Sequence, residues 1–124
     1  MICLDCGNNY LLDVLSLIDK MQKNSTFDGD NSCLRPMLNN NTSFYNTRPV
    51  TFYLCNNSLL TVNYGDNLES SIFRIEKICD NCVTVRLLSQ DETGTISATS
   101  EMATININCI AAIRCLNDIN LTIL

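Results

Sequence analysis

The sequence predicts a mainly β protein, a small β-sandwich or open barrel of about eight short antiparallel strands with one N-terminal amphipathic helix. Near the N-terminus, apolar residues recur with helical spacing. After Pro49, β-branched and aromatic residues gather in short runs that turn residues separate. At 124 residues the chain has the length of a single domain, 1–124, and is long enough to bury a core without disulfides.

The N-terminal part divides into three segments. Residues 1–8 are expected to form a flexible segment that carries cysteines. Residues 9–23 are expected to form the helix, because their apolar side chains have the three- and four-residue spacing of one helix face. These apolar positions are Leu11, Val14, Leu15, Ile18 and Met21. Residues 24–46 are polar and contain Gly29 and Pro36, so we expect a long irregular connection there.

The β-rich core is expected over residues 47–124. Asn, Asp and Gly residues divide this part of the chain into short segments with strand composition. The predicted strands are 50–55, 59–64, 72–78, 82–88, 95–98, 103–109, 110–116 and 119–123.

The hairpin between the third and fourth of these strands has two candidate registers. A three-residue loop, 79–81, places the apolar residues Phe73 and Ile75 opposite the apolar face of the next strand. A two-residue loop pairs charged residues with apolar ones instead. We prefer the first register, because a shift by one residue moves a whole apolar set into water. It sets Arg74 opposite Arg86, which is a modest electrostatic cost.

The charge balance argues against a nucleic-acid partner. The chain has 8 Lys and Arg against 13 Asp and Glu, a net charge of −5, and its basic residues are scattered rather than gathered into a stripe that could bind phosphates. Its apolar runs are too short to cross a bilayer, so no membrane insertion is expected. The first residues lack the basic and apolar regions of a secretory signal, so synthesis without a signal peptide is expected.

The composition also argues against an enzyme. A nucleophilic cysteine usually requires a base, commonly histidine, and the chain contains no histidine. The carboxylates fall mostly in predicted loops, where a solvated surface is the simplest interpretation. We therefore predict no catalytic residues, no cofactor-binding residues and no cofactor.

The eight cysteines are the chemically distinctive residues. Two Cys-x-x-Cys pairs, Cys3/Cys6 and Cys79/Cys82, have a spacing that can supply four thiolates to zinc. Residues 7–78 separate the pairs, far more than the roughly 15 to 20 residues of a compact ribbon. We therefore assign no metal site and keep a cytosolic zinc-binding module as the alternative. A thioredoxin-like redox pair is disfavoured, because the second pair flanks a predicted hairpin rather than opening a helix.

The other interpretation is that the thiols join copies of the chain. Several cysteines lie in predicted termini, connections and turns, where the fold offers them no evident partner, and oxidation can link such thiols between molecules. The candidate intermolecular disulfide residues are Cys3, Cys6, Cys33 and Cys79. The candidates for core or disulfide positions are Cys55, Cys82, Cys109 and Cys115. A polymerising subunit that is cross-linked when its surroundings become oxidising fits this distribution.

Six stretches, spread over nearly the whole chain, share a pattern with a known family. They are 11–15 (LLDVL), 33–38 (CLRPML), 46–49 (NTRP), 71–76 (SIFRIE), 82–88 (CVTVRLL) and 104–119 (TININCIAAIRCLNDI). In this order they resemble the CotY/CotZ/ExsY family of spore coat and exosporium proteins. The cysteines that match family cysteines are Cys33, Cys82, Cys109 and Cys115, whereas Tyr10 and Ala111 stand where the family has cysteine.

The resemblance implies a structural subunit that assembles into a two-dimensional hexagonal lattice in the outer bacterial spore coat, the crust or the exosporium. It implies reinforcement by intermolecular disulfides, a homo-oligomer based on hexamers, and contact with other spore coat and exosporium proteins. It also implies synthesis in the mother-cell cytoplasm during sporulation, followed by oxidation on the spore surface.

Overall fold

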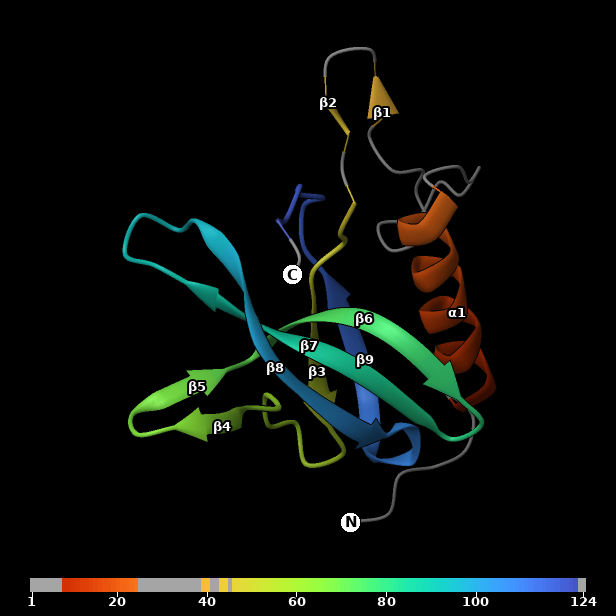
Figure 1. Cartoon of the computed structure of the whole chain (residues 1–124). Helices are drawn as coiled ribbons and strands as arrows, with labels where there is room; N and C mark the ends of the chain where they lie inside the picture. The colour runs from red at the N-terminus through yellow and green to blue at the C-terminus, as the bar shows by residue number, and fades with distance from the viewer. Residues whose placement is uncertain (1–7, 25–38, 41–42, 45, 123–124) are drawn as a thin grey trace.

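The fold is described by a computed structural model that covers residues 8–24, 39–40, 43–44 and 46–122 (Figure 1). Within these residues a helix packs against an open antiparallel sheet. The mainly β class with one N-terminal helix is therefore confirmed. The sheet begins and ends in edge strands, so it does not close into a barrel.

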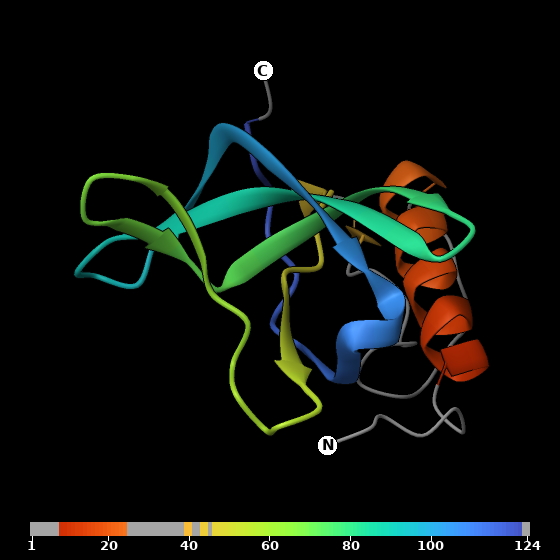
Figure 2. The same cartoon turned by 90° about the horizontal axis from the view of Figure 1, so that it is seen from below.

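Helix α1 (Asn8–Asn24) lies along one side of the sheet (Figures 1 and 2). All five apolar positions that predict the helix are buried, from Leu11 to Met21. Exposed polar residues such as Asp13 and Lys20 lie on the opposite face. The helix is stable at this place because its apolar stripe is covered by the sheet, since most helical stability in proteins comes from the packing of an amphipathic face.

The main sheet has five strands in the order β8-β7-β6-β3-β9, and every neighbouring pair is antiparallel. Its strands are β3 (Val50–Leu54), β6 (Ile72–Cys79), β7 (Cys82–Gln90), β8 (Ile96–Asn106) and β9 (Ile110–Cys115). A short 3-10 helix, η2 (Ile107–Cys109), joins the two edge strands β8 and β9. Two further pairs form separate two-stranded sheets, β1 (Asn39–Asn40) with β2 (Ser43–Phe44) and β4 (Val62–Gly65) with β5 (Leu68–Ser70).

The core lies between α1 and one face of the main sheet. At its centre the rings of Phe52 and Phe73 stack with centroids 5.6 Å apart. Alternate residues of β6 and β7 also face this layer, because side chains alternate across a strand. The buried apolar residues of these two strands include Phe73, Ile75, Val83, Val85 and Leu87.

The β6–β7 hairpin combines features of both candidate registers. Phe73 pairs with Leu87, and the apolar faces meet as predicted. The three-residue loop is wrong, because Asp80 and Asn81 form a two-residue turn. The register shifts between Ile75 and Lys77, where β6 carries one extra residue in a bulge. Because of this bulge, the apolar faces pair as predicted although the turn has two residues rather than three.

Four predicted strands differ from the structure. The strands predicted at 95–98 and 103–109 are joined in the single strand β8, which ends at Asn106. Its register against β7 shifts between Arg86 and Leu88. The last three residues of the second predicted strand, 107–109, form η2 instead. A strand is absent from the described part of 119–123, where Ile119 makes only an isolated bridge to Thr47. The strand predicted at 59–64 begins at Val62.

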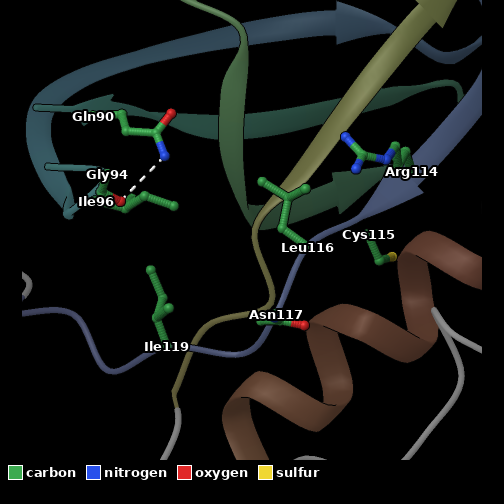
Figure 3. Close-up of a pocket in the computed structure, with 8 residues that line it drawn as sticks. All are labelled: Gln90, Gly94, Ile96, Arg114, Cys115, Leu116, Asn117 and Ile119. Carbon is green, nitrogen blue, oxygen red and sulfur yellow. Dashed lines mark hydrogen bonds between the residues drawn. The ribbon is translucent and has the colours of Figure 1, made fainter. Parts of the chain in front are cut away.

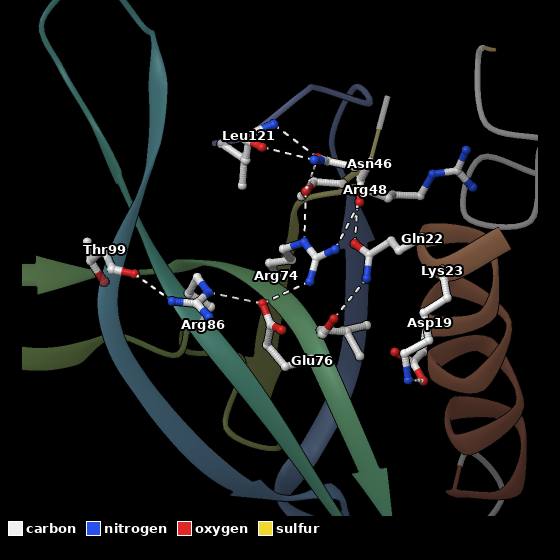
Figure 4. A network of polar contacts seen from close by, with 12 residues as sticks. Asp19, Gln22, Lys23, Asn46, Arg48, Arg74, Glu76, Arg86, Thr99 and Leu121 are labelled. Atoms are coloured by element: carbon white, nitrogen blue, oxygen red, sulfur yellow. Dashed lines mark hydrogen bonds and ion pairs between the residues drawn. The ribbon is translucent and has the colours of Figure 1, made fainter. Parts of the chain in front are cut away.

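The most buried polar interaction joins Arg48, just before β3, to Asp118, just after β9. Arg48 Nε and Nη2 donate to the two carboxylate oxygens at 2.7 and 2.9 Å, and both side chains are fully shielded from solvent. The Arg48 backbone N–H donates to Gln22 Oε1 on α1 at 3.0 Å, and Gln22 Nε2 donates to the Ile75 carbonyl at 2.8 Å (Figure 4). These contacts connect the helix, the sheet and the segment that follows β9.

A second polar network lies on the face of the sheet away from the core. Glu76 Oε2 accepts hydrogen bonds from Arg74 Nη1 at 2.8 Å and Arg86 Nε at 3.1 Å (Figure 4). The carboxylate thus sits between two arginines that the register places opposite each other. Arg74 also donates to Thr47 Oγ1, and Arg86 donates to the Thr99 carbonyl. The glutamate offsets the like-charge cost of this pair.

We predict that Arg48→Met lowers the free energy of unfolding by about 3 to 5 kcal/mol, because it leaves the Asp118 carboxylate buried without its cation. Adding Asp118→Leu should recover much of that loss, since a buried ion pair is often replaceable by packed apolar groups. The measurement is denaturant unfolding at one fixed redox condition. Lys23→Ala is the matched control, because the exposed Lys23–Asp19 pair should contribute at most about 0.5 kcal/mol. A double variant no more stable than Arg48→Met contradicts this account.

Candidate functional site

The structure describes five of the eight cysteines. Cys55 and Cys115 each take part in a disulfide bond, whereas Cys79, Cys82 and Cys109 carry free thiols. The remaining candidates, Cys3, Cys6 and Cys33, lie outside the described residues, so the structure leaves their proposed roles untested. Available thiols among the described residues are therefore confined to three positions.

These three free thiols lie at one end of the sheet, which we call the thiol end (Cys79, Cys82 and Cys109). Cys79 and Cys82 are directly opposed across the β6–β7 turn. The Ile107 backbone N–H donates to the Asn81 carbonyl at 2.8 Å and so fastens η2 to that turn. Cys109 ends η2, which brings it to the same end of the molecule.

The exposure of the three thiols differs. Cys79 and Cys109 are exposed, whereas Cys82 is half-buried. The exposed position of Cys109 follows from η2, because the 3-10 turn interrupts the extended chain and Asn106 caps it by accepting the Asn108 N–H at 3.0 Å. Cys115, on β9, instead packs against the core. Cys109 and Cys115 are therefore in different surroundings.

The opposed pair, Cys79 and Cys82, is not arranged as a ready disulfide. Directly opposed residues of an antiparallel pair have Cβ atoms about 4.5 to 5.5 Å apart. Disulfides need a shorter Cβ separation, about 3.5 to 4.5 Å. Both thiols are free in the structure and therefore available to other partners.

A groove lies at some distance along the sheet, between the β7–β8 loop and the segment after β9. It has a volume of about 410 Å³ (Figure 3). Its lining residues are Gln90, Gly94, Ile96, Arg114, Cys115, Leu116, Asn117 and Ile119. This lining holds one charged side chain, Arg114, and three larger aliphatic ones. It contains no carboxylate and no free thiol, so it offers neither a general base nor a nucleophile.

The loop that forms one wall of this groove is held by its own hydrogen bonds. Asp91 Oδ1 accepts from the Thr93 hydroxyl at 2.7 Å and from the Thr95 backbone N–H at 2.9 Å. The hydrogen bond from the Thr93 side chain, followed by that from Thr95, holds the pKa of Asp91 below its usual value. Gly94 adopts φ 91°, which suits glycine, and its carbonyl accepts from Gln90 Nε2 at 3.1 Å. The wall is therefore preformed.

The described part of the chain contains no site that could hold zinc. Groups of three or more Cys, Asp or Glu side chains that could hold a metal ion are absent from these residues. Cys79 and Cys82 alone supply two ligands, and the pair Cys3/Cys6 lies outside the described residues. The hairpin position of Cys79 and Cys82 also differs from the helix start of thioredoxin-like sites.

The fold and the thiols define a small, mainly β, thiol-bearing domain. A family model described as spore coat protein Z matches residues 6–103, which is most of the chain. The chain therefore belongs to the spore coat protein Z family, as the sequence resemblance predicts. A search of curated proteins and a search of solved structures each found no match.

Membership of this family supports a structural role in the spore coat, at the spore surface, in assembly with other coat proteins. A structural role of this kind points away from an enzyme. Among the helices that the structure describes, none has the length and apolar character needed to cross a membrane.

We predict that, in the folded and fully reduced protein, a charged alkylating reagent modifies Cys79 and Cys109 faster than Cys82. The reason is exposure, because the reagent must reach the sulfur and Cys82 is half-buried. Peptide mapping by mass spectrometry after short pulses measures the three rates. Denatured protein is the control and should show similar rates at all three. Equal rates in the folded protein would contradict the described thiol end.

Proposed function

We propose that the chain is a self-assembling subunit of a two-dimensional, hexagonal lattice in the outer spore coat, the crust or the exosporium. Membership of the spore coat protein Z family carries this proposal. Repeated non-covalent contacts between identical copies supply the order, because a ring contact together with a second contact between rings can tile a plane. The low charge helps, since a net charge of −5 opposes dense packing only weakly.

Intermolecular disulfides then supply resilience. Exposed thiols are needed for such bonds, and the described chain offers them at Cys79 and Cys109. Cys3, Cys6 and Cys33 remain candidates from the sequence. Disulfide formation joins two thiolates and passes their two electrons to an oxidant, such as a low-molecular-weight disulfide, that meets the assembled surface. Oxidation therefore follows assembly rather than directing it.

Electron microscopy of the purified, reduced protein tests the lattice. We expect ordered sheets or rings at high protein concentration, because the ordering contacts are non-covalent. Preparations at low concentration serve as the control. Discrete monomers at every concentration would rule the lattice out, whatever the state of the cysteines.

Non-reducing gels of oxidised assemblies test the cross-links. Ladders that collapse with reductant are expected, and Cys79→Ser and Cys109→Ser should each thin the ladder. Cys82→Ser is the matched control at the same hairpin and should thin it less, because Cys82 is half-buried. A Cys3→Ser/Cys6→Ser variant reports on the N-terminal candidates. Ladders unchanged in all of these variants would contradict the cross-linking role while leaving the lattice intact.

A further inference from the structure

The β4–β5 hairpin projects from the body as a separate two-stranded arm (Figures 1 and 2). We define the arm as residues 59–70. Its tip is the two-residue turn Asp66-Asn67, in which Asn67 adopts φ 58°. Both views place the arm on the same side of the molecule as the β7–β8 loop, away from α1. The arm is therefore accessible to a neighbouring molecule.

The tip of the arm carries an exposed leucine flanked by acids. Leu68 is 49% exposed, one of four exposed large apolar side chains among the described residues. Leu68 packs closely over Gly65, where a Cβ would lie 3.0 Å from Leu68 Cδ1. Asp66 and Glu69 on either side are also exposed, and residues 59–70 contain no basic residue. The tip of the arm therefore presents an apolar side chain flanked by negative charges.

The groove between the β7–β8 loop and the segment after β9 has the complementary character. Three aliphatic side chains, Ile96, Leu116 and Ile119, line it together with Arg114, its single charged residue (Figure 3). Arg114 is exposed on β9. The groove has a volume of about 410 Å³, which lies within the range of about 300 to 1,000 Å³ that is typical of ligand clefts. This volume is larger than that of one side chain.

We propose that this groove receives the tip of the β4–β5 arm of a second copy of the chain. Leu68 enters against the aliphatic side chains, and Asp66 in the turn faces Arg114. Charge complementarity favours a second copy, because one chain carries both the acidic residues at the tip of the arm and a groove whose single charged lining residue is Arg114. None of the described residues that line the groove belongs to the arm of the same chain. This contact rests on the proposed assembly function and names one of its non-covalent interfaces.

The contact can repeat from copy to copy. It joins two different patches of the same chain, so each subunit can give one arm and accept another. It lies apart from the thiol end, whose cysteines are on the β6–β7 turn and η2. Assembly through the arm therefore does not need oxidation, and cross-linking does not occupy the arm.

A charge exchange tests the contact. The assembly of Arg114→Glu and of Asp66→Lys is followed separately by light scattering under reductant, with sheets checked by electron microscopy. Each variant should raise the protein concentration at which assemblies appear by about tenfold, because an attraction becomes a repulsion. The two variants mixed together, and the double variant Arg114→Glu/Asp66→Lys, should both recover assembly, because each restores opposite charges.

Two control variants reverse a charge, one in each direction, at positions outside the arm and the groove. Lys77→Glu and Glu101→Lys alter exposed residues outside the arm and groove and should leave the threshold near that of the unchanged chain. Recovery on mixing also shows that both variants are folded. If the unchanged chain assembles and Arg114→Glu and Asp66→Lys do so equally well, the arm contact is wrong and the assembly function stands. If the unchanged chain remains monomeric, the assembly function fails and the contact fails with it.

Discussion

The buried ion pair between Arg48 and Asp118 is the constraint on which the arrangement of the molecule depends. Burying two charges is costly unless each is paired and hydrogen-bonded, and the bidentate geometry meets that condition. The pair joins the start of β3 to the segment that follows β9, and Gln22 adds the end of α1 to the same point. Because Asp118 lies between Asn117 and Ile119, the pair also positions one wall of the groove.

The free thiols and the arm lie on different parts of the protein and have different chemistry. The thiol end is built from a tight turn and a 3-10 helix, both of which present side chains to solvent. The arm and the groove present apolar surface and opposite charges instead. In the proposed assembly, this division separates two tasks. Weak, reversible contacts can select the correct arrangement before covalent bonds make it permanent.

Local patterns in the sequence predict the features that depend on neighbouring residues. The helix follows from its apolar spacing, and the pairing of Phe73 with Leu87 follows from the apolar faces. The length of that hairpin's loop cannot be predicted from the apolar pattern, because the bulge near Glu76 leaves this pattern unchanged. The polar run between the predicted strands 95–98 and 103–109 resembles a turn, yet it is an irregular stretch within β8. The ion pair and the groove join residues far apart in the chain, for which no local signal exists.

High-resolution electron cryomicroscopy of the oxidised assembly tests the central claim most directly, because it shows order and cross-links in one specimen. We expect a repeating lattice of whole subunits with continuous sulfur density between cysteines of neighbouring copies, including those of the thiol end. Density that joins cysteines only within single chains, or copies without a repeating arrangement, would contradict it.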